Sequence, residues 1–296
     1  MTTLYQTVQA LESLYPLKNA ESWDAPGLIV GDLSSQVHRI VCVSDPTLAT
    51  VRRACGMDGD LLITHHPLFY KPVHEVSGNG VRGEIVRYLV ESHCALWVGH
   101  TNADVAWRGV AHAAADYFGL QYLHPLVPSK DTDLYGREVG IGRVGELPAP
   151  MALRDFAQRV FDALPQTQVG VQVCGDINTM VRRVAVVPGA GDSYLDKVRE
   201  CEADVYVTSD MRHHPTLDSI ERSRYELQLR QSCGLMNETN NRVRPAIINT
   251  SHSAIESLWF NYAIPDIADA VENVSGARPE VTWFGIACDP WNYVIH

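Results

Sequence analysis

The chain has 296 residues, of which 46% are hydrophobic, so it can bury a substantial core and is long enough for two domains. It carries 24 basic and 35 acidic residues, and the net charge of −11 disfavours proteins that bind nucleic acid over a broad surface. Seven cysteines without a C-x-x-C motif indicate reduced thiols, and the sequence shows neither a signal peptide nor an apolar run of membrane-spanning length. We therefore expect a soluble, cytoplasmic protein.

The first 32 residues predict a helix followed by turns. Apolar residues recur at helical spacing: Leu4, Val8, Leu11 and Leu14. This stripe predicts an amphipathic helix over residues 3–15 that ends before Pro16 and covers a sheet. Trp23 and Asp24 then fall in a turn-rich stretch. For these two residues we favour a packed indole beside a turn-capping aspartate over a pair that lines a pocket.

A strand, a helix and a strand are predicted twice. The first set spans 39–65, with its helix over about 47–55, and the second spans 183–208, with its helix over about 193–201. A constant offset of 144 residues aligns the two sets: Arg39 with Arg183, Asp60 with Asp204, and Thr64 with Thr208. We interpret this recurrence as an internal duplication, which predicts an α/β protein with two related α/β domains.

The predicted domains are interleaved along the chain. A Pro-rich polar stretch over 121–133 is interpreted as the crossing between them. We expect a discontinuous first domain, 1–125 plus 247–296, and a second domain over 126–246. The charged segment near 221–244, with its Asn-rich run 237–241, predicts an exposed, mobile insertion.

Two glycine-rich stretches allow different interpretations. Residues 140–145 open no helix directly, so we interpret them as a strand with bulges or turns and not as a nucleotide fingerprint. The stretch 188–193 lies between a predicted strand and a predicted helix, where backbone amides can bind an anion. A tight turn capped by Asp192 or Ser193 explains the same residues without a ligand, and both interpretations stay open.

A histidine pair follows one of the buried strands. The apolar run 61–63 and Pro67 predict a strand that ends near Thr64, so His65 and His66 leave it at its carboxyl end. Open α/β sheets place their chemistry at that edge. Because imidazole is the commonest metal ligand in proteins, the pair indicates a metal site, with satisfied surface or core histidines as the alternative.

Two further strand ends carry a histidine together with a carboxylate. His100 and Asp104 follow one apolar run, and His252 and Glu256 follow another. If one helix contains His252 and Glu256, their spacing of four residues places them on one face, where they can share a metal. The competing interpretation is a capping box of Ser253 and Glu256, which would leave His252 outside the helix.

Together these motifs resemble the GTP cyclohydrolase I type 2 homologs, also called NIF-three-like or dinuclear metal centre hexameric proteins. The resemblance rests on four motifs in the family's order: Trp23-Asp24-x-x-Gly27-Leu28-x-x-Gly31, Thr64-His65-His66-Pro67-Leu68, His100-Thr101-Asn102-x-Asp104 and His252-x-x-x-Glu256. It extends from about residue 5 to residue 291. It implies a NIF-three-like fold with the metal site in the cleft between its two related α/β domains.

The resemblance also implies a set of site residues. The family's metal ligands fall on His65, His66, Asp104, His252 and Glu256. Its G-D-x-K/R-x-H motif falls on 209–214, so Asp210 and His214, together with His100, are candidates for supporting roles beside the metal. The chain departs from the family pattern in three places: Ser209 replaces a glycine, Thr250-Ser251 replaces a small residue followed by glycine, and the separation from His214 to His252 is longer than usual.

Five such ligands can bind two divalent ions when one carboxylate bridges them, a centre suited to hydrolysis. Imidazole and carboxylate ligands fit zinc, manganese, iron or cobalt. The resemblance thus implies a metal-dependent hydrolase, GTP cyclohydrolase-like or phosphatase-like, that acts on a nucleotide or a small phosphoester and forms a toroidal homohexamer. The alternative is a non-catalytic metal-binding regulatory or scaffold ring.

Overall fold

The computed structural model describes residues 2–235, 242–285 and 288–295. The chain forms two compact units. The first comprises Met1–Val110 and Ser257–Cys288, and the second comprises Ala111–Glu256 and Asp289–His296. These limits differ from the predicted domain limits of 125/126 and 246/247, because strand 121–124 and strand 246–250 both belong to the sheet of the second unit. The domain limits of 125/126 and 246/247 therefore remain a prediction from the sequence.

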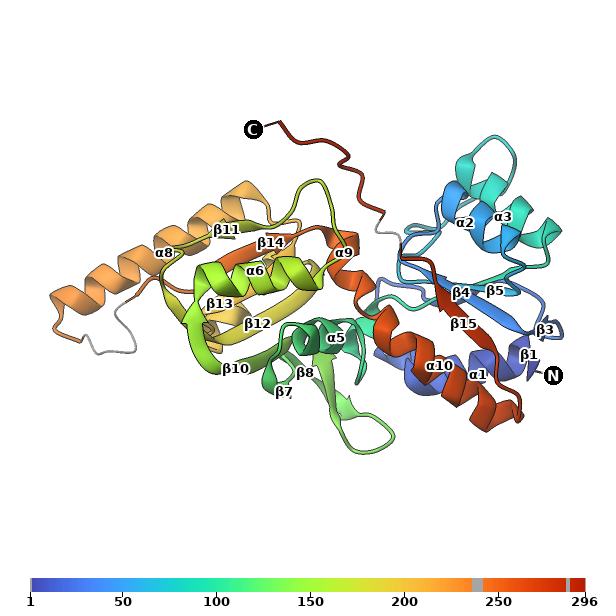
Figure 1. Cartoon of the computed structure of the whole chain (residues 1–296), viewed down its shortest axis with the longest axis horizontal. Helices are drawn as coiled ribbons and strands as arrows, with labels where there is room; N and C mark the ends of the chain where they lie inside the picture. The colour runs from blue at the N-terminus through green and yellow to red at the C-terminus, as the bar shows by residue number, and fades with distance from the viewer. Residues whose placement is uncertain (1, 236–241, 286–287, 296) are drawn as a thin grey trace. The chain divides into compact units, whose positions relative to one another are not determined.

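The first unit is a five-stranded sheet between two layers of helices (Figure 1). Its strands are, in spatial order, β15 (Glu280–Trp283), β4 (Arg39–Val43), β5 (Leu61–Thr64), β6 (Ala95–Val98) and β2 (Gly27–Val30). All are parallel except β2, which pairs antiparallel with β6. Both faces of the central strands are buried, which explains their uninterrupted apolar runs.

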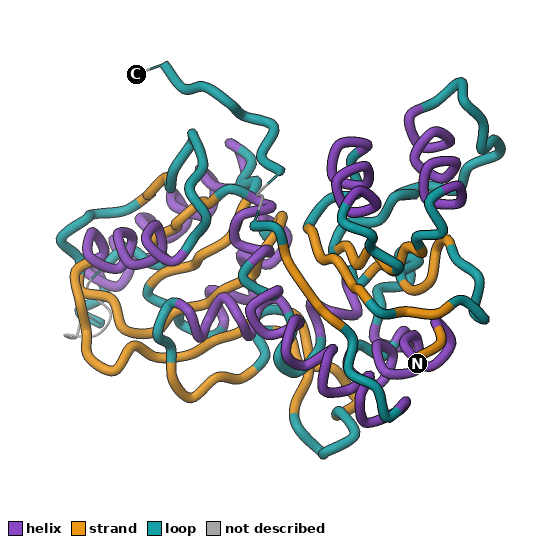
Figure 2. The backbone as a smooth tube through the Cα atoms, turned by 45° about the vertical axis from the view of Figure 1, so that its right-hand side comes forward, coloured by secondary structure: helices purple, strands orange, loops and turns teal. Residues whose placement is uncertain are grey.

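Two helices cover each face of this sheet (Figure 2). Helices α1 (Leu4–Leu14) and α10 (Phe260–Ser275) pack together on one face. Helices α2 (Leu48–Gly56) and α3 (Val81–Glu91) cover the other. The predicted first helix is therefore confirmed, and Thr3 and Gln6 cap its start with a reciprocal capping box. Shorter elements complete the unit: β1 (Thr2–Thr3), β3 (Gln36–Val37), the 3₁₀ turn Leu17–Asn19 and α4 (Thr101–Val105).

The second unit contains a six-stranded mixed sheet. Its strands are, in spatial order, β11 (Gln172–Cys174), β14 (Ala246–Thr250), β13 (Val205–Ser209), β12 (Met180–Ala190), β10 (Arg143–Ala152) and β7 (Gln121–His124). The central strands β12, β13 and β14 are parallel, and the outer pairings are antiparallel. The remaining elements are α5 (Val110–Tyr117), β8 (Val127–Thr132), β9 (Glu138–Ile141), α6 (Leu153–Ala163), the 3₁₀ turn Asp192–Tyr194, α7 (Leu195–Glu200), α8 (His213–Ser232) and α9 (His252–Ser257).

The same backbone contacts recur in the two units at the predicted offset of 144 residues. In each unit one aspartate side chain accepts two consecutive backbone amides, at the start of β4 in the first unit and within β12 in the second. The contacts are His38 N (2.7 Å) and Arg39 N (2.9 Å) to Asp60 Oδ2, and Arg182 N (2.9 Å) and Arg183 N (3.0 Å) to Asp204 Oδ2. These equivalent contacts support the proposed duplication.

Three local predictions can be compared with the structure. The stretch 121–133, predicted to be a crossing, contains strands β7 and β8. The proposed insertion near 221–244 is helical as far as Ser232, because ion pairs at helical spacing, such as Glu221 with Arg224, stabilise a polar helix. Its Asn-rich run 237–241 lies outside the described residues. Residues 140–145 form strands, as predicted.

The seven cysteines all lie in the described part of the chain and form no disulfide, as the odd count and the missing C-x-x-C motif predicted. Within the described ranges, no helix combines the length and the apolar character needed to cross a membrane.

Candidate metal centre

The first group of histidines lies at the carboxyl edge of the parallel strands in the first unit. Strand β5 ends at Thr64 and is followed by the histidine pair, and β6 ends at Val98, two residues before His100. The turn after β5 is fixed by two hydrogen bonds: Thr64 Oγ1 donates to the His66 carbonyl (2.8 Å), and His66 N donates to the Ser44 carbonyl (2.8 Å). The chain has left the strand there, so two adjacent histidines need not point to opposite faces of the sheet.

The His65 side chain is almost fully buried, with 1% of its surface exposed. Its Nδ1 lies 2.8 Å from the Gly99 carbonyl oxygen and must donate to it, so the lone pair of the ring is on Nε2, which could bind a metal. That Nε2 is 3.9 Å from Asp104 Oδ1. Two ligand atoms on one ion, each bonded at about 2 Å, lie about 3–4 Å apart, so this separation suits a shared metal.

His66 is held by a carboxylate that the sequence analysis did not select. Its Nδ1 donates to Asp45 Oδ1 at 2.8 Å, so here too the lone pair of the ring is on Nε2, which could bind a metal. Asp45 lies two residues after the end of strand β4, so it occupies the same kind of strand-end position as the histidines. Its place just after a predicted strand is the sequence signal that could have identified Asp45 as a site residue.

The second group belongs to helix α9, which begins at His252 and therefore contains both His252 and Glu256. His252 Nδ1 donates to Asp210 Oδ2 at 2.7 Å, and its Nε2 is 3.0 Å from Glu256 Oε1. With Nδ1 as the donor, Nε2 and Oε1 are two acceptors facing each other, so a proton or a metal ion must lie between them. The capping-box alternative, which required His252 to lie outside the helix, was wrong.

Gly189 in β12 provides the space for Glu256. Its φ is +79°, and a Cβ added there would lie 2.7 Å from Glu256 Oε1. The glycine in the stretch 188–193 therefore lets the backbone approach a buried carboxylate. Neither interpretation of the sequence predicted this role. Neither of the proposed caps is formed at this turn; Asp192 instead pairs with Arg212.

Among the residues that the structure describes, His65, His66 and Glu256 form a group of side chains that could hold a metal ion. Within the first unit, the Trp259 ring lies 5.8 Å from the His65 ring. The donor set fits a transition metal: three histidines each have Nδ1 fixed by an acceptor, the arrangement typical of metal-binding histidines.

The predicted supporting residues behave differently from one another. His100 Nδ1 contacts Asp24 Oδ2 at 2.9 Å, and the His100 ring lies 5.4 Å from the His65 ring. Burial opposes the ionisation of Asp24, but hydrogen bonds from His100 and Thr101 outweigh it and lower the pKa of Asp24 to about 2. His214, in contrast, is exposed on α8.

A family model described as Duf34/NIF3 (NGG1p interacting factor 3) matches residues 2–229, more than three quarters of the chain. The chain belongs to the Duf34/NIF3 family. The match contains His65, His66 and Asp104 and ends before His252 and Glu256. A Streptomyces coelicolor protein named GTP cyclohydrolase 1 type 2 homolog is 42% identical over 219 residues, covering 74% of this chain and 76% of that protein. A Mycobacterium leprae protein of the same name is 27% identical and covers 98% and 95%.

Solved structures of other proteins share the fold of this chain. A Bacillus cereus protein related to NIF3 superposes with a TM-score of 0.83 at 20% identity, covering 99% of both chains. A Staphylococcus aureus hypothetical protein superposes with a TM-score of 0.81 at 25% identity, also covering 99% of both. The predicted resemblance is thus confirmed. Two of the departures from the family pattern meet in space, since Ser209 Oγ and Thr250 Oγ1 form a 2.9 Å hydrogen bond between neighbouring strands.

Proposed function

We propose that this Duf34/NIF3 protein binds two divalent metal ions per chain and is a metal-dependent hydrolase that acts on a nucleotide or a small phosphoester. The observation that supports it best is the common arrangement of three histidines, His65, His66 and His252. Each has its Nδ1 fixed by a carbonyl or carboxylate oxygen, so that Nε2 is the ligand atom.

The proposed ligand set comprises five side chains: His65, His66, Asp104, His252 and Glu256. Together they would hold two divalent ions, and both carboxylates, Asp104 and Glu256, lie near an imidazole Nε2. When bound, a pair of divalent ions lowers the pKa of a bound water and stabilises a developing oxyanion, which is the chemistry that hydrolysis requires.

The supporting residues would orient the ligands. Asp45 and Asp210 hold the rings of His66 and His252 in one tautomer and one orientation. His100 has its Nδ1 held by Asp24, so its Nε2 is the atom at which it could exchange a proton with a bound substrate. The relatives named GTP cyclohydrolase 1 type 2 homolog and the imidazole and carboxylate donors agree with a hydrolytic centre that uses zinc, manganese, iron or cobalt.

Two measurements test the proposal together. Elemental analysis of protein purified without chelator should return about two transition-metal ions per chain, since five ligands exceed what one catalytic ion usually takes from protein. A panel of nucleotides and phosphoesters should show metal-dependent turnover that His66→Ala abolishes. The matched control is His74→Ala, which removes an exposed histidine of the same unit and should change neither result. At most one ion per chain after reconstitution would exclude the dinuclear centre.

A second candidate function is a non-catalytic metal-binding regulatory or scaffold ring. It would be favoured by two bound ions without turnover of any compound in the panel. In both cases we propose a cytoplasmic, toroidal homohexamer that takes small molecules and not nucleic acid, because a charge of −11 per chain would be summed around the ring. Light scattering tests the assembly, and a monomer mass near 32.8 kDa would contradict it.

A further inference from the structure

Two large aromatic side chains of the first unit are exposed next to the histidines. Trp23 and Tyr70 each have 58% of their surface exposed. Their rings are stacked, with centroids 6.0 Å apart and an angle of 28° between the planes. The sequence had predicted a packed indole at Trp23, and that prediction was wrong. An exposed aromatic pair of this kind is typical of a binding surface and not of a core.

The pair is continuous with the candidate metal centre. His100 meets Trp23 edge to face at 5.8 Å and Tyr70 at 6.0 Å. The same His100 ring lies 5.4 Å from the ring of His65 and 6.0 Å from that of His66. A row of rings therefore runs within the first unit from the exposed pair, through His100, to two of the proposed ligands.

The exposed rings project from fixed backbone. Thr101 Oγ1 accepts the amide of Glu21 at 2.9 Å and donates to Asp24 Oδ2 at 2.6 Å, so the chain is anchored on both sides of Trp23. Tyr70 follows Leu68, which is 4% exposed and belongs to the core beneath α2 and α3. Because both segments are anchored, little conformational freedom of the backbone is lost when a ligand binds the rings.

We propose that Trp23 and Tyr70 form a stacking platform for the base of a nucleotide whose remaining part reaches the metal centre. This inference rests on the proposed function and narrows its substrate class, since an aliphatic phosphoester has no planar ring to stack. Flat heterocycles stack on indole and phenol rings, and removing one such aromatic typically weakens binding of a base by about 5-fold to 150-fold.

The test compares two probes that differ in the base alone. Binding of a nucleoside 5′-monophosphate and of ribose 5-phosphate is measured by calorimetry on metal-loaded wild type, Trp23→Ala, Trp23→Phe and Tyr70→Ala. We expect Trp23→Ala to raise the Kd of the nucleotide by about 5-fold to 150-fold and to leave the Kd of ribose 5-phosphate unchanged. Trp23→Phe, which keeps a flat ring, should restore part of the affinity.

The matched control is Tyr225→Ala, which removes an equally exposed aromatic from α8 in the second unit and should alter neither Kd. Equal losses for both probes, unchanged nucleotide binding, or no binding of either probe would overturn the platform. So would a change of oligomer mass in Trp23→Ala with both affinities intact, since the pair would then contact another copy of the chain. Metal content measured on the same samples distinguishes failure of the proposed metal centre from failure of the platform. Base-dependent binding by protein that contains no metal would refute the metal centre and leave the platform standing.

Discussion

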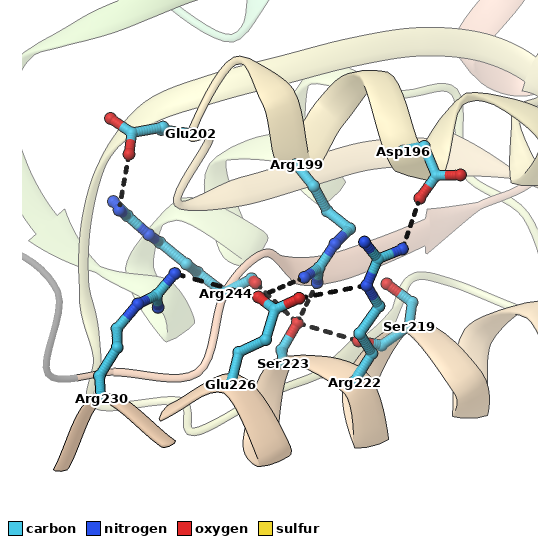
Figure 3. A network of polar contacts seen from close by, with 9 residues as sticks. All are labelled: Asp196, Arg199, Glu202, Ser219, Arg222, Ser223, Glu226, Arg230 and Arg244. Atoms are coloured by element: carbon cyan, nitrogen blue, oxygen red, sulfur yellow. Dashed lines mark hydrogen bonds and ion pairs between the residues drawn. The ribbon is translucent and has the colours of Figure 1, made fainter. Parts of the chain in front are cut away.

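Two regions of the molecule are dense in ionisable side chains, yet they differ in what those side chains contact. In the second unit an arginine network joins α7 and α8 (Figure 3). There Glu226 accepts hydrogen bonds from Arg199 at 2.6 Å and Arg222 at 3.1 Å, and lies 3.9 Å from Arg230. In the candidate metal centre the carboxylates of Asp104 and Glu256 lie near imidazole nitrogens instead.

The comparison shows that the type of partner, and not the density of charge, separates a structural network from a ligand site. A guanidinium stays protonated and offers donors but no lone pair, so its partners form ion pairs. A neutral imidazole with Nδ1 engaged offers a lone pair at Nε2. Burial opposes the ionisation of Glu226, but the charge and hydrogen bonds of Arg199, followed by those of Arg222, outweigh it and lower its pKa. The Glu226 carboxylate is therefore ionised and paired with its arginines.

The largest contrast is expected from removing one proposed ligand. His66→Ala should lower metal affinity by more than about 100-fold, because loss of a direct ligand exceeds the 10–100-fold typical for an outer partner. Elemental analysis and competition with a chelator measure it. In the arginine network, Glu226→Gln should leave the bound metal unchanged, and if it released metal as readily as His66→Ala, the distinction between the two regions would fail.

Removal of an orienting carboxylate should have an intermediate effect. In Asp45→Asn the His66 ring loses the acceptor that fixes its tautomer, so metal affinity should fall by about 10-fold to 100-fold. The same titration against a chelator gives the ratio. Asp218→Asn, which changes an exposed aspartate on α8, is the control. An affinity equal to that of the wild type would mean that Asp45 does not orient the ligand.

Gly189→Ala tests the close approach of the backbone to Glu256. The added Cβ would lie 2.7 Å from Oε1 and the residue has φ +79°, so we expect both a loss of unfolding free energy of about 1–3 kcal/mol and weaker metal binding. Gly276→Ala is the matched control, because Gly276 has φ +74° with nothing within 4 Å. Gly276→Ala should lose only the unfolding free energy that the positive φ costs an alanine, measured by urea unfolding. Its metal binding should be unchanged.

The smallest effect is expected from Glu226→Gln, through stability and its dependence on pH. The partly exposed ion pairs should contribute about 1 kcal/mol at neutral pH. Since the folded pKa of Glu226 is lowered, this contribution is present above the usual glutamate pKa of about 4 and is lost as the pH falls below it. Denaturant unfolding of wild type and variant should therefore differ at pH 7 and converge in acid. A constant difference would assign the effect to packing.

Much of the scaffold could be predicted because it depends on local patterns. The apolar run of β4 and the stripe of α1 specify elements whose observed ends lie within about two residues of the predicted ones. Helix α8 was missed because its residues are mostly polar, so no apolar stripe marked it, although its charges at spacings of three and four are a helical signal.

By itself, the sequence determined which side chains follow the strand ends, because the carboxyl ends of parallel strands are set by where the apolar runs stop. Only the tertiary structure decided how those side chains are oriented. The acceptors that fix the histidine rings come from distant positions, as Asp45 does for His66 and Asp210 for His252. The exposure of Trp23 was decided in the same way, since burial depends on which segments pack around a residue and no local pattern specifies them.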